Sequence, residues 1–499
     1  MSGPLGPKLA IARAVGALSR LRGGGATSVP GKVLTRLEPD AIGLLGARLS
    51  RGSVLISATN GKTTTAAMLA SILKRAGLPL VHNRAGANMA GGIASTLLAA
   101  AHGRAGIDGE LGLFEVDEFW LAQLVAQLRP RAILLGNLFR DQLDRYGELE
   151  TIAERWAKTL QENPGRDARL VLNADDPMVA DLGRARADAE GSANRSAADV
   201  VYFGVDDNSL ALPHMAHAAD AKHCRNCGAP YSFDAVYLGH LGHYRCPSCG
   251  QARPAPIVRA TDVHLEGVRA ARFMLHTPAG AAEVALPLPG LYNVYNALAA
   301  AALAYALDVS LETIVAGLQN TRAAFGRAET VTLSATEPGG ETVERELRIL
   351  LVKNPAGANE VLRTLALEPG EHDLLGVLND NTADGRDVSW VWDADFELLA
   401  GRVRRATCSG TRAAELAVRL KYAGVELARI EVQPELATAL SMALGGREEE
   451  EEEEEEEGTA GGAPAPGPRA PLYALPTYTA MLALRDLLAE RGVTGSALT

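Results

Sequence analysis

Short apolar runs alternate with helical patterns between residues 54 and 219. The helical patterns place apolar residues three or four positions apart, as on one buried face of a helix. Continuous apolar runs of this length are typical of parallel strands, which are buried on both faces of a sheet. The alternation therefore predicts an α/β domain with a parallel sheet. The runs occupy residues 54–56, 113–116, 132–135, 170–172 and 200–203.

The same kind of pattern returns later in the chain. Strand-like alternation over 268–290 leads into an Ala/Leu-rich helical pattern over 291–307, which we expect to continue the first sheet. The pattern breaks near residue 327, and new apolar runs begin near residue 348. We therefore expect an N-terminal segment 1–50 packed on a central domain 51–325, followed by a C-terminal α/β domain of the Rossmann type over 326–499.

One insertion in the C-terminal domain lacks any periodicity. Ten consecutive glutamates at 448–457 are followed by a stretch rich in Pro and Gly. Such a segment repels itself and has little apolar surface to bury, so 446–470 is predicted to be disordered. Binding of a divalent cation or a basic partner by the glutamates remains an alternative.

The composition and the net charge of the chain exclude some classes of function. Hydrophobic residues make up 47% of the 499 residues, which suffices for real cores, and the net charge of −11 disfavours broad nucleic-acid binding. No apolar stretch approaches the length of about 20 residues that spans a bilayer. Arg13 interrupts the apolar region that a signal peptide would need. We expect a cytoplasmic protein, with contact between a basic N-terminal helix and the inner membrane surface left open.

A candidate phosphate-binding loop follows the first apolar run. Segment 58–64 reads ATNGKTT and leads into a helical pattern. The first N–H groups of a helix bind anions, Gly61 allows close approach, Lys62 adds charge, and Thr63 offers a hydroxyl to Mg²⁺. The loop therefore predicts an ATP site, although a strict Walker pattern would have glycine at Ile56.

Four of the five cysteines form a metal-binding pattern. Cys224 and Cys227 are separated by eighteen residues from the pair Cys246 and Cys249. Two such knuckles, each with a glycine after its second cysteine, predict a four-cysteine zinc ribbon over 221–254 with a structural Zn²⁺. His223, His240 and His243 lie beside the cysteines and are interpreted as bystanders.

Two polar clusters follow later strands of the predicted sheet. Glu115, Asp117 and Glu118 come directly after the run 113–116 or at its end, and Asn137, Asp141 and Asp144 follow the run 132–135. Because carboxyl ends of parallel strands share one edge of a sheet, these groups could hold the Mg²⁺ of ATP.

Together these motifs resemble the Mur ligase family, and the resemblance covers most of the chain. The loop, FEVDEF at 114–119, NLFRDQLDRYG at 137–147, LPGLYNVYNALAA at 288–300, FGRAE at 325–329 and VKNPAGANE at 352–360 occur in the family's order. The resemblance implies a Mur ligase-like central P-loop ATPase domain. It places Lys158 near a position that is a carbamoylated lysine in many members.

The resemblance also implies site residues. Glu115 matches the metal-binding glutamate, Asn293 and Asn296 match asparagines that approach the nucleotide, and Arg327 matches the arginine before the last domain. The implied nucleotide-binding residues are Thr59, Asn60, Gly61, Lys62, Thr63, Thr64, Asn293, Asn296 and Arg327. Lys62 and Glu115 are implied in catalysis, with Thr63 and Glu115 as magnesium ligands.

Departures from the family pattern point to one of its branches. Tyr292 and Gln142 replace histidines, Leu350 replaces an aspartate, and amino-acid-adding members lack a ribbon. The chain is similar in these respects to the branch that amidates lipid II. This implies ATP-dependent conversion of the D-glutamate α-carboxylate of lipid II to D-isoglutamine through an acyl phosphate.

That reaction implies a source of ammonia outside this chain. Release of ammonia from glutamine takes an activated cysteine, and the cysteine outside the ribbon, Cys408, has no obvious histidine partner. The resemblance implies a GatD-type glutaminase subunit whose site is completed by an aspartate of the DNTADG segment. Asp380 and Asp384 are both candidates for this catalytic role.

Two other functions stay open from the sequence. An amino-acid-adding Mur-like ligase would act without a glutaminase partner. A zinc-ribbon adaptor with an inactive nucleotide fold is disfavoured by the intact Gly61, Lys62 and Glu115.

Overall fold

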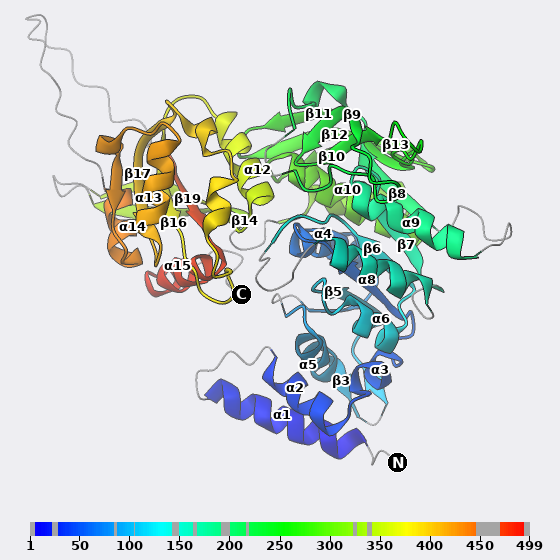
Figure 1. Cartoon of the computed structure of the whole chain (residues 1–499). Helices are drawn as coiled ribbons and strands as arrows, with labels where there is room; N and C mark the ends of the chain where they lie inside the picture. The colour runs from blue at the N-terminus through cyan, green and yellow to red at the C-terminus, as the bar shows by residue number, and fades with distance from the viewer. Residues whose placement is uncertain are drawn as a thin grey trace, which may run out of the picture. The chain divides into compact units, whose positions relative to one another are not determined.

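The computed structural model divides the chain into two compact units, Met1–Arg322 and Ala323–Thr499 (Figure 1). Each unit is described by itself. The structure describes all residues except 1–4, 22–27, 84–86, 104, 142–148, 163–166, 191–199, 216–218, 323–326, 337–341, 446–469 and 494–499. The predicted insertion 446–470, Gln142 and Asp144 therefore lie outside the described residues, apart from position 470, and so does the side chain of Arg327.

The first unit is built on a nine-stranded sheet with the order β13-β12-β11-β8-β7-β6-β1-β5-β2. Strands β2 to β8 of this sheet pair in parallel, and β11 adds in parallel to β8 before β12 and β13 follow antiparallel. The strands are β1 (Ser53–Ser57), β2 (Leu80–His82), β5 (Leu111–Glu115), β6 (Ala132–Leu135), β7 (Arg169–Asn173), β8 (Val200–Val205), β11 (Val258–Glu266), β12 (Ala270–Thr277) and β13 (Gly280–Leu286).

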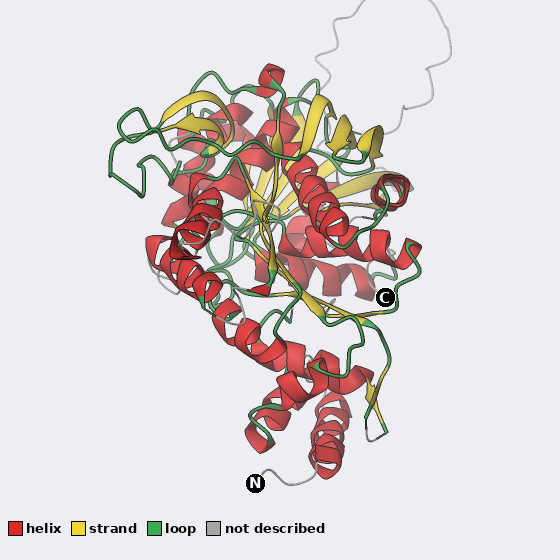
Figure 2. Ribbon diagram, turned by 90° about the vertical axis from the view of Figure 1, so that its right-hand side faces the viewer, coloured by secondary structure: helices red, strands yellow, loops and turns green. Residues whose placement is uncertain are grey.

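Helices cover both faces of this sheet (Figure 2). Every residue of β1, β5 and β6 is buried, as expected of central parallel strands. Helix α10 is buried over nearly its whole length because its Ala side chains allow close packing, and it contacts α4. The helices are α4 (Lys62–Arg75), α5 (Ala90–Ala100), α6 (Leu121–Leu128), α8 (Leu149–Gln161), α9 (Pro177–Glu190), α10 (Leu291–Ala306) and α11 (Leu311–Gln319).

Two smaller elements complete the first unit. At its N-terminus α1 (Leu5–Leu21), α2 (Val29–Leu37) and α3 (Ala41–Gly46) pack against one another and against α5. Between β8 and β11 the chain forms a separate two-stranded hairpin, β9 (Ser232–Leu238) and β10 (Leu241–Arg245). The four cysteines lie before and after this hairpin, so the ribbon is an insertion between two neighbouring strands of the first sheet.

The second unit has a six-stranded sheet with the order β14-β15-β19-β16-β17-β18. Strands β14 and β15 form an antiparallel hairpin, and the others pair in parallel. Its elements are β14 (Arg327–Thr336), β15 (Thr342–Leu350), α12 (Pro355–Ala366), β16 (His372–Val377), β17 (Val403–Ser409), α13 (Ala413–Tyr422), β18 (Ile430–Val432), α14 (Leu436–Leu444), β19 (Leu472–Pro476) and α15 (Tyr478–Glu490).

The predicted α/β fold class is confirmed in both units. The alternation of buried strands with amphipathic helices carried this prediction. The structure also joins β11, β12 and β13 to the first sheet, where the sequence predicts a continuation over 268–290. In the described part of the chain, no helix combines the length and the apolar character needed to cross a bilayer.

Candidate functional site

The phosphate-binding loop lies between β1 and α4, at the carboxyl edge of the first sheet. Gly61 has φ 83, a left-handed conformation that favours glycine. A Cβ at this position would lie 2.0 Å from Oδ1 of Asn296. Both observations show why a side chain is excluded here, and the backbone of the loop stays accessible to an anion at the start of α4.

The loop is held by the segment that follows β6. The side chain of Asn137 accepts from the Asn60 N–H at 2.9 Å and donates to the Asn60 carbonyl at 3.1 Å. The hydroxyl of Thr59 accepts from the Phe139 N–H at 3.0 Å. Asn137, interpreted from the sequence as part of a metal cluster, therefore fixes the loop backbone.

Thr63 and Glu115 meet at the ends of neighbouring elements. Glu115 ends β5, which pairs with β1, and its Oε2 accepts from the Thr63 hydroxyl at 2.8 Å. Asn83, at the end of β2, holds the Glu115 backbone from both sides through bonds of 2.8 and 3.0 Å. No local pattern in the sequence singles out Asn83, because its partner lies 32 positions away.

Lys62 is enclosed by carboxylates and loop carbonyls. Its ammonium lies 3.0 Å from Oε2 of Glu118 and also donates to the carbonyl of Ala58, and its side chain is 11% exposed. Burial lowers the pKa of Lys62, but the nearby charges of Glu118 and Glu115 outweigh it and raise the pKa above its ordinary value. Lys62 is therefore a permanent cation beside the loop.

Of the two asparagines of α10, Asn296 reaches the same loop and Asn293 supports it. Asn296 accepts from the Thr65 hydroxyl at 3.3 Å and donates to Asn293 at 3.1 Å, and Asn293 donates to the Pro289 carbonyl at 2.8 Å. Both are buried. The structure thus brings Asn296 to the loop from more than 200 positions away in the sequence.

The donor set fits a magnesium ion bound to a nucleotide phosphate. Octahedral Mg²⁺ has bonds of about 2.0–2.1 Å, so adjacent ligands lie about 2.9 Å apart. The oxygens of Thr63 and Glu115 are 2.8 Å apart, which matches one edge of such an octahedron. The close approach permitted by Gly61 and the cation of Lys62 add the groups that polyphosphate requires.

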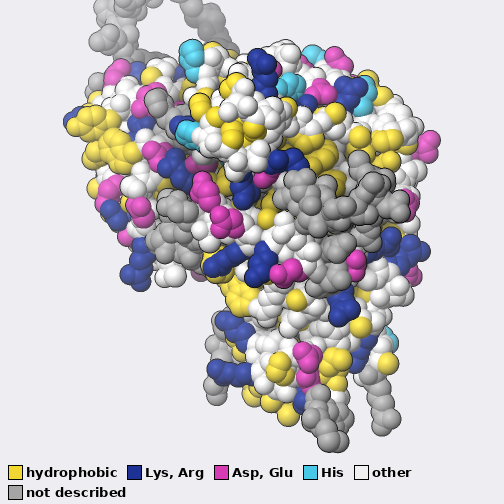
Figure 3. Space-filling view, turned by 45° about the vertical axis from the view of Figure 1, so that its right-hand side comes forward, with side chains coloured by type: hydrophobic (Ala, Val, Ile, Leu, Met, Phe, Trp, Pro, Cys, Tyr) yellow, Lys and Arg dark blue, Asp and Glu magenta, His cyan; other side chains and the backbone are white. Residues whose placement is uncertain are grey.

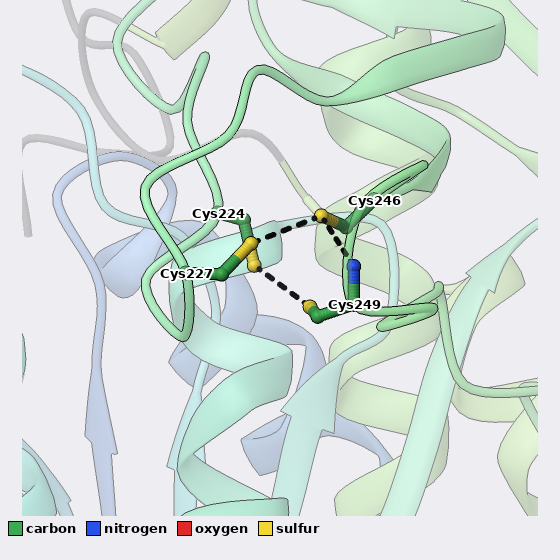
Figure 4. A group of neighbouring side chains, drawn as sticks. All are labelled: Cys224, Cys227, Cys246 and Cys249. Carbon is green, nitrogen blue, oxygen red and sulfur yellow. Dashed lines mark hydrogen bonds between the residues drawn. The ribbon is translucent and has the colours of Figure 1, made fainter.

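The four cysteines converge on one point, as Figure 4 shows. Their Sγ atoms all lie within 4.8 Å of one another, with 3.6 Å between Cys224 and Cys249 and 3.4 Å between Cys227 and Cys246. Ligands of tetrahedral zinc with Zn–S bonds of about 2.3 Å lie about 3.8 Å apart. A hydrogen bond from the Gln251 backbone is the main cause that lowers the pKa of Cys249 to about 6, which favours the thiolate that a metal binds. The cluster thus fits a metal ion.

The hairpin of the ribbon packs against the segment that follows β6 and holds the phosphate loop. His240, in the turn between β9 and β10, is fully buried, and its ring lies 4.8 Å from that of Phe139. Its Nε2 lies 3.4 Å from Asp176, which accepts from the Leu138 N–H at 2.9 Å. His240 is not among the clustered metal ligands, and its packing instead links the ribbon to the segment that holds Thr59.

We expect Cys246→Ser to remove the bound metal and to lower the free energy of unfolding by at least about 2 kcal/mol, because a closed site contributes its binding energy to folding. Metal content and thermal melting measure this. The matched control is Ser248→Ala, an exposed residue of the same knuckle. Chelator treatment of the unmodified protein should reproduce the effect. A metal-free variant that melts like the parent would contradict a stabilising role.

The two candidate aspartates of the second unit differ in their surroundings. Asp380 follows β16, its side chain is 34% exposed, and it pairs with Arg412 at 3.2 Å and the Thr411 hydroxyl at 2.8 Å. The hydrogen bond from Thr411, and then that from Arg412, lowers the pKa of Asp380. Asp384 is buried and accepts from the Thr479 N–H at 2.7 Å at the start of α15, and burial raises its pKa.

Two further residues that the sequence analysis singled out differ in their exposure to solvent. Cys408 is fully buried in β17, and burial raises the pKa of its thiol to about 12. It is therefore not an activated nucleophile. Lys158 is exposed on α8.

Comparisons with known families and proteins agree with this geometry. Residues 56–226 match the Mur ligase middle domain, and residues 351–481 match the MurT ligase C-terminal domain. The solved pseudomurein peptide ligase type C from Methanothermus fervidus has a TM-score of 0.60 at 23% identity, covering 89% of this chain and 79% of that one. MurF from Acinetobacter baumannii has a TM-score of 0.57 at 18% identity, covering 91% and 80%. At such identities these likenesses show the fold.

Curated relatives are more similar in sequence. The lipid II isoglutaminyl synthase (glutamine-hydrolyzing) subunit MurT of Streptococcus pneumoniae is 31% identical over 478 residues, which covers 95% of each chain. The subunit of the same name from Staphylococcus aureus is 31% identical over 411 residues, covering 82% of this chain and 86% of that one. The chain therefore belongs to the MurT branch of the Mur ligase family, a family of ATP-dependent ligases.

Proposed function

We propose that this chain is the ATP-consuming subunit that amidates the D-glutamate α-carboxylate of lipid II to D-isoglutamine. The observation that carries the proposal is the arrangement of Lys62, Thr63 and Glu115 around a phosphate loop, in a chain similar over 95% of its length to a subunit named for lipid II isoglutaminyl synthesis. Peptidoglycan synthesis is the process that this reaction would serve.

A carboxylate does not react with ammonia at neutral pH, so it must first be activated. In the proposed reaction a carboxylate oxygen forms a bond to the γ-phosphorus of ATP, and the bond to ADP breaks. Ammonia then forms the C–N bond of the amide, and phosphate leaves with the former carboxylate oxygen. A proton from the attacking ammonia is lost to solvent or a base as the amide forms.

The residues of the loop would serve the first of these steps. Lys62 would neutralise charge on the transferring phosphoryl group, and backbone groups at Gly61 would orient it. Thr63 and Glu115 would hold Mg²⁺, which supplies further charge neutralisation at the phosphate oxygens. Asn83 would keep the Glu115 carboxylate in place through its two bonds to the Glu115 backbone. Asn293, Asn296 and Arg327 remain proposed nucleotide contacts.

Ammonia would come from a GatD-type glutaminase subunit. Within the described residues, Cys408 is the cysteine outside the metal cluster, and its burial and raised pKa are unsuited to attack on glutamine. We propose Asp380 as the residue that completes the partner's site. Its carboxylate is partly exposed, favoured in the ionised form and fixed by Thr411 and Arg412, as the orienting carboxylate of a triad must be.

Asp384 fits a structural role in this proposal. Its carboxylate satisfies the backbone N–H of Thr479 in the first turn of α15, so it caps this helix from a distant loop. The four cysteines are proposed to hold a structural Zn²⁺, because thiolates in a closed tetrahedral set are typical of that ion.

Amidation of lipid II by the purified chain with ATP and Mg²⁺ tests the proposal. Ammonium or glutamine is supplied in separate reactions, each with and without a GatD-type subunit, and the product is identified by mass spectrometry. We expect product from ammonium, and product from glutamine only when the partner is present. No amidation, together with ATP consumption that depends on a free amino acid, would favour an amino-acid-adding ligase instead.

A further inference from the structure

Helix α1 presents an apolar face away from the protein. At spacings of three and four residues its outer side carries Ile11 and Leu18, which are 51% and 58% exposed, and smaller exposed residues between and beside them. The exposed members of this face, here called the outer α1 face, contain no charged or hydrogen-bonding side chain. They are Pro7, Ala10, Ile11, Ala14, Ala17 and Leu18.

The orientation of α1 is fixed by its opposite side. Leu9 and Ala12 are buried, and a Cβ added to Gly16 would lie 2.7 Å from the ring of Pro30, which shows how closely α1 and α2 pack. Arg13 donates to the carbonyls of Leu98, at 3.1 Å, and Ala101 at the end of α5. The outer α1 face is therefore presented to solvent by a well-packed helix.

Exposed apolar side chains are concentrated in this part of the molecule. Of the fourteen large hydrophobic residues that are exposed in the described chain, five belong to α1, α2 and α3. Besides Ile11 and Leu18 they are Val29, Leu37 and Leu44. Figure 3 shows hydrophobic side chains at its lower end, where Figure 1 draws these helices, together with Lys and Arg and some Asp or Glu side chains. Exposed apolar groups gathered in this way mark interaction surfaces.

The charge of residues 1–37 indicates the kind of surface that these helices would bind. Residues 1–37 contain six Lys or Arg residues and no Asp or Glu, although the whole chain has a net charge of −11. Lys32 and Arg36 are exposed on α2, next to α1 in the helix packing. Lys8 pairs with Glu38 at 2.8 Å, and the segment keeps a net positive charge from its other Lys and Arg residues. An exposed apolar helix face in a net basic segment fits the surface of an anionic bilayer, where the apolar side enters the interface and the cations meet lipid phosphates.

We propose that α1 docks the enzyme on an anionic lipid surface through the outer α1 face. The purpose of such docking rests on the proposed function, because the lipid-anchored substrate of that reaction is presented at a membrane. The helix face and the charge of residues 1–37 are independent of that function. Docking through one helix would be reversible and would weaken with rising salt, because the cations contribute to it.

Sedimentation with vesicles of phosphatidylglycerol and phosphatidylcholine in equal parts tests the docking. We expect the full chain to bind these vesicles, and to bind vesicles of phosphatidylcholine alone more weakly. Ile11→Ser/Leu18→Ser should reduce binding by at least about 10-fold, because two large apolar side chains no longer enter the interface. Both residues are exposed, so thermal melting should be unchanged. The matched control is Leu367→Ser/Met442→Ser, two exposed hydrophobic residues of the second unit.

Three results would overturn this inference. The full chain could fail to bind the vesicles, or the double variant could bind like the parent. Light scattering without lipid could show an oligomer that the double variant loses, in which case a second copy covers the face. Loss of GatD-type subunit binding in the variant would assign the face to that partner.

Amidation of detergent-solubilised lipid II separates this inference from the proposed function. The double variant should retain this activity, because α1 carries no residue of the phosphate site. If the parent binds vesicles but does not amidate lipid II in detergent, the proposed function fails and the docking stands. If it amidates but does not bind, only the docking fails.

Discussion

Lys62→Ala is expected to reduce kcat/KM for ATP-dependent amidation by about 10³-fold, the largest effect of any single substitution considered for this chain. The ammonium is enclosed with Glu118 and Glu115 beside the phosphate loop, and these charges keep it protonated. Charge on a transferring phosphoryl group is stabilised chiefly by such fixed cations, and no other residue of the loop carries a positive charge. Initial rates with ammonium as the nitrogen source measure the effect without involving the glutaminase.

Two companion variants make this result interpretable. Lys74→Ala removes an exposed lysine from the last turn of the same helix and should leave activity near that of the parent. Because Lys62 is only 11% exposed and balances buried carboxylates, its loss could also destabilise the domain. Lys62→Gln keeps the length and most of the packing. A folded Lys62→Gln variant with full activity would show that the loop does not serve phosphoryl transfer.

Asp380→Asn is expected to reduce glutamine-driven amidation by about 10²-fold or more, while amidation from added ammonium stays within about 2-fold of the parent. An asparagine in place of an orienting carboxylate no longer stabilises the charged histidine of a triad. In the proposed reaction, the step from free ammonia onward would use the phosphate site, which lies in the other unit of the chain. The ratio of the two rates therefore reports on the glutaminase site alone. The measurement requires the complex with a GatD-type subunit.

Asp384→Asn is the matched control, because it lies four positions away in the same loop. Its carboxylate accepts from the Thr479 backbone, so its replacement should alter thermal melting and affect both nitrogen sources equally. Equal loss with glutamine and ammonium in Asp380→Asn would remove Asp380 from the role. A selective loss of glutamine-driven activity in Asp384→Asn would assign the role to Asp384 instead.

The central strands of the first sheet could be predicted because their signal is local. The runs at 54–56 and 132–135 are continuous and apolar, and strands buried on both faces require this. The same holds for the ribbon, since four cysteines at knuckle spacing have few other uses. The prediction of a phosphate loop at 58–64 also rests on neighbouring residues, namely Gly61, Lys62 and Thr63.

Contacts between distant segments could not be predicted in this way. Asn137 was interpreted as part of a metal cluster, but its amide pairs with the backbone of Asn60, 77 positions earlier. His240 is interpreted from the sequence as a bystander of the ribbon. It lies outside the four-cysteine cluster, but its packing on Phe139 connects the ribbon with the segment that holds the loop. Nothing within the segment around either residue distinguishes these contacts from ordinary polar or core positions.

The sequence by itself determined the α/β class, the phosphate loop and the four-cysteine cluster, because periodicity, glycine conformation and ligand spacing act between residues close in the chain. Only the tertiary structure decided that Asn83 clamps Glu115, that Asn296 excludes a side chain at Gly61, and that Asp380 is accessible where Asp384 is buried. These features depend on which strand ends and helix ends meet at the edge of a sheet. That depends on strand order, which no local pattern encodes.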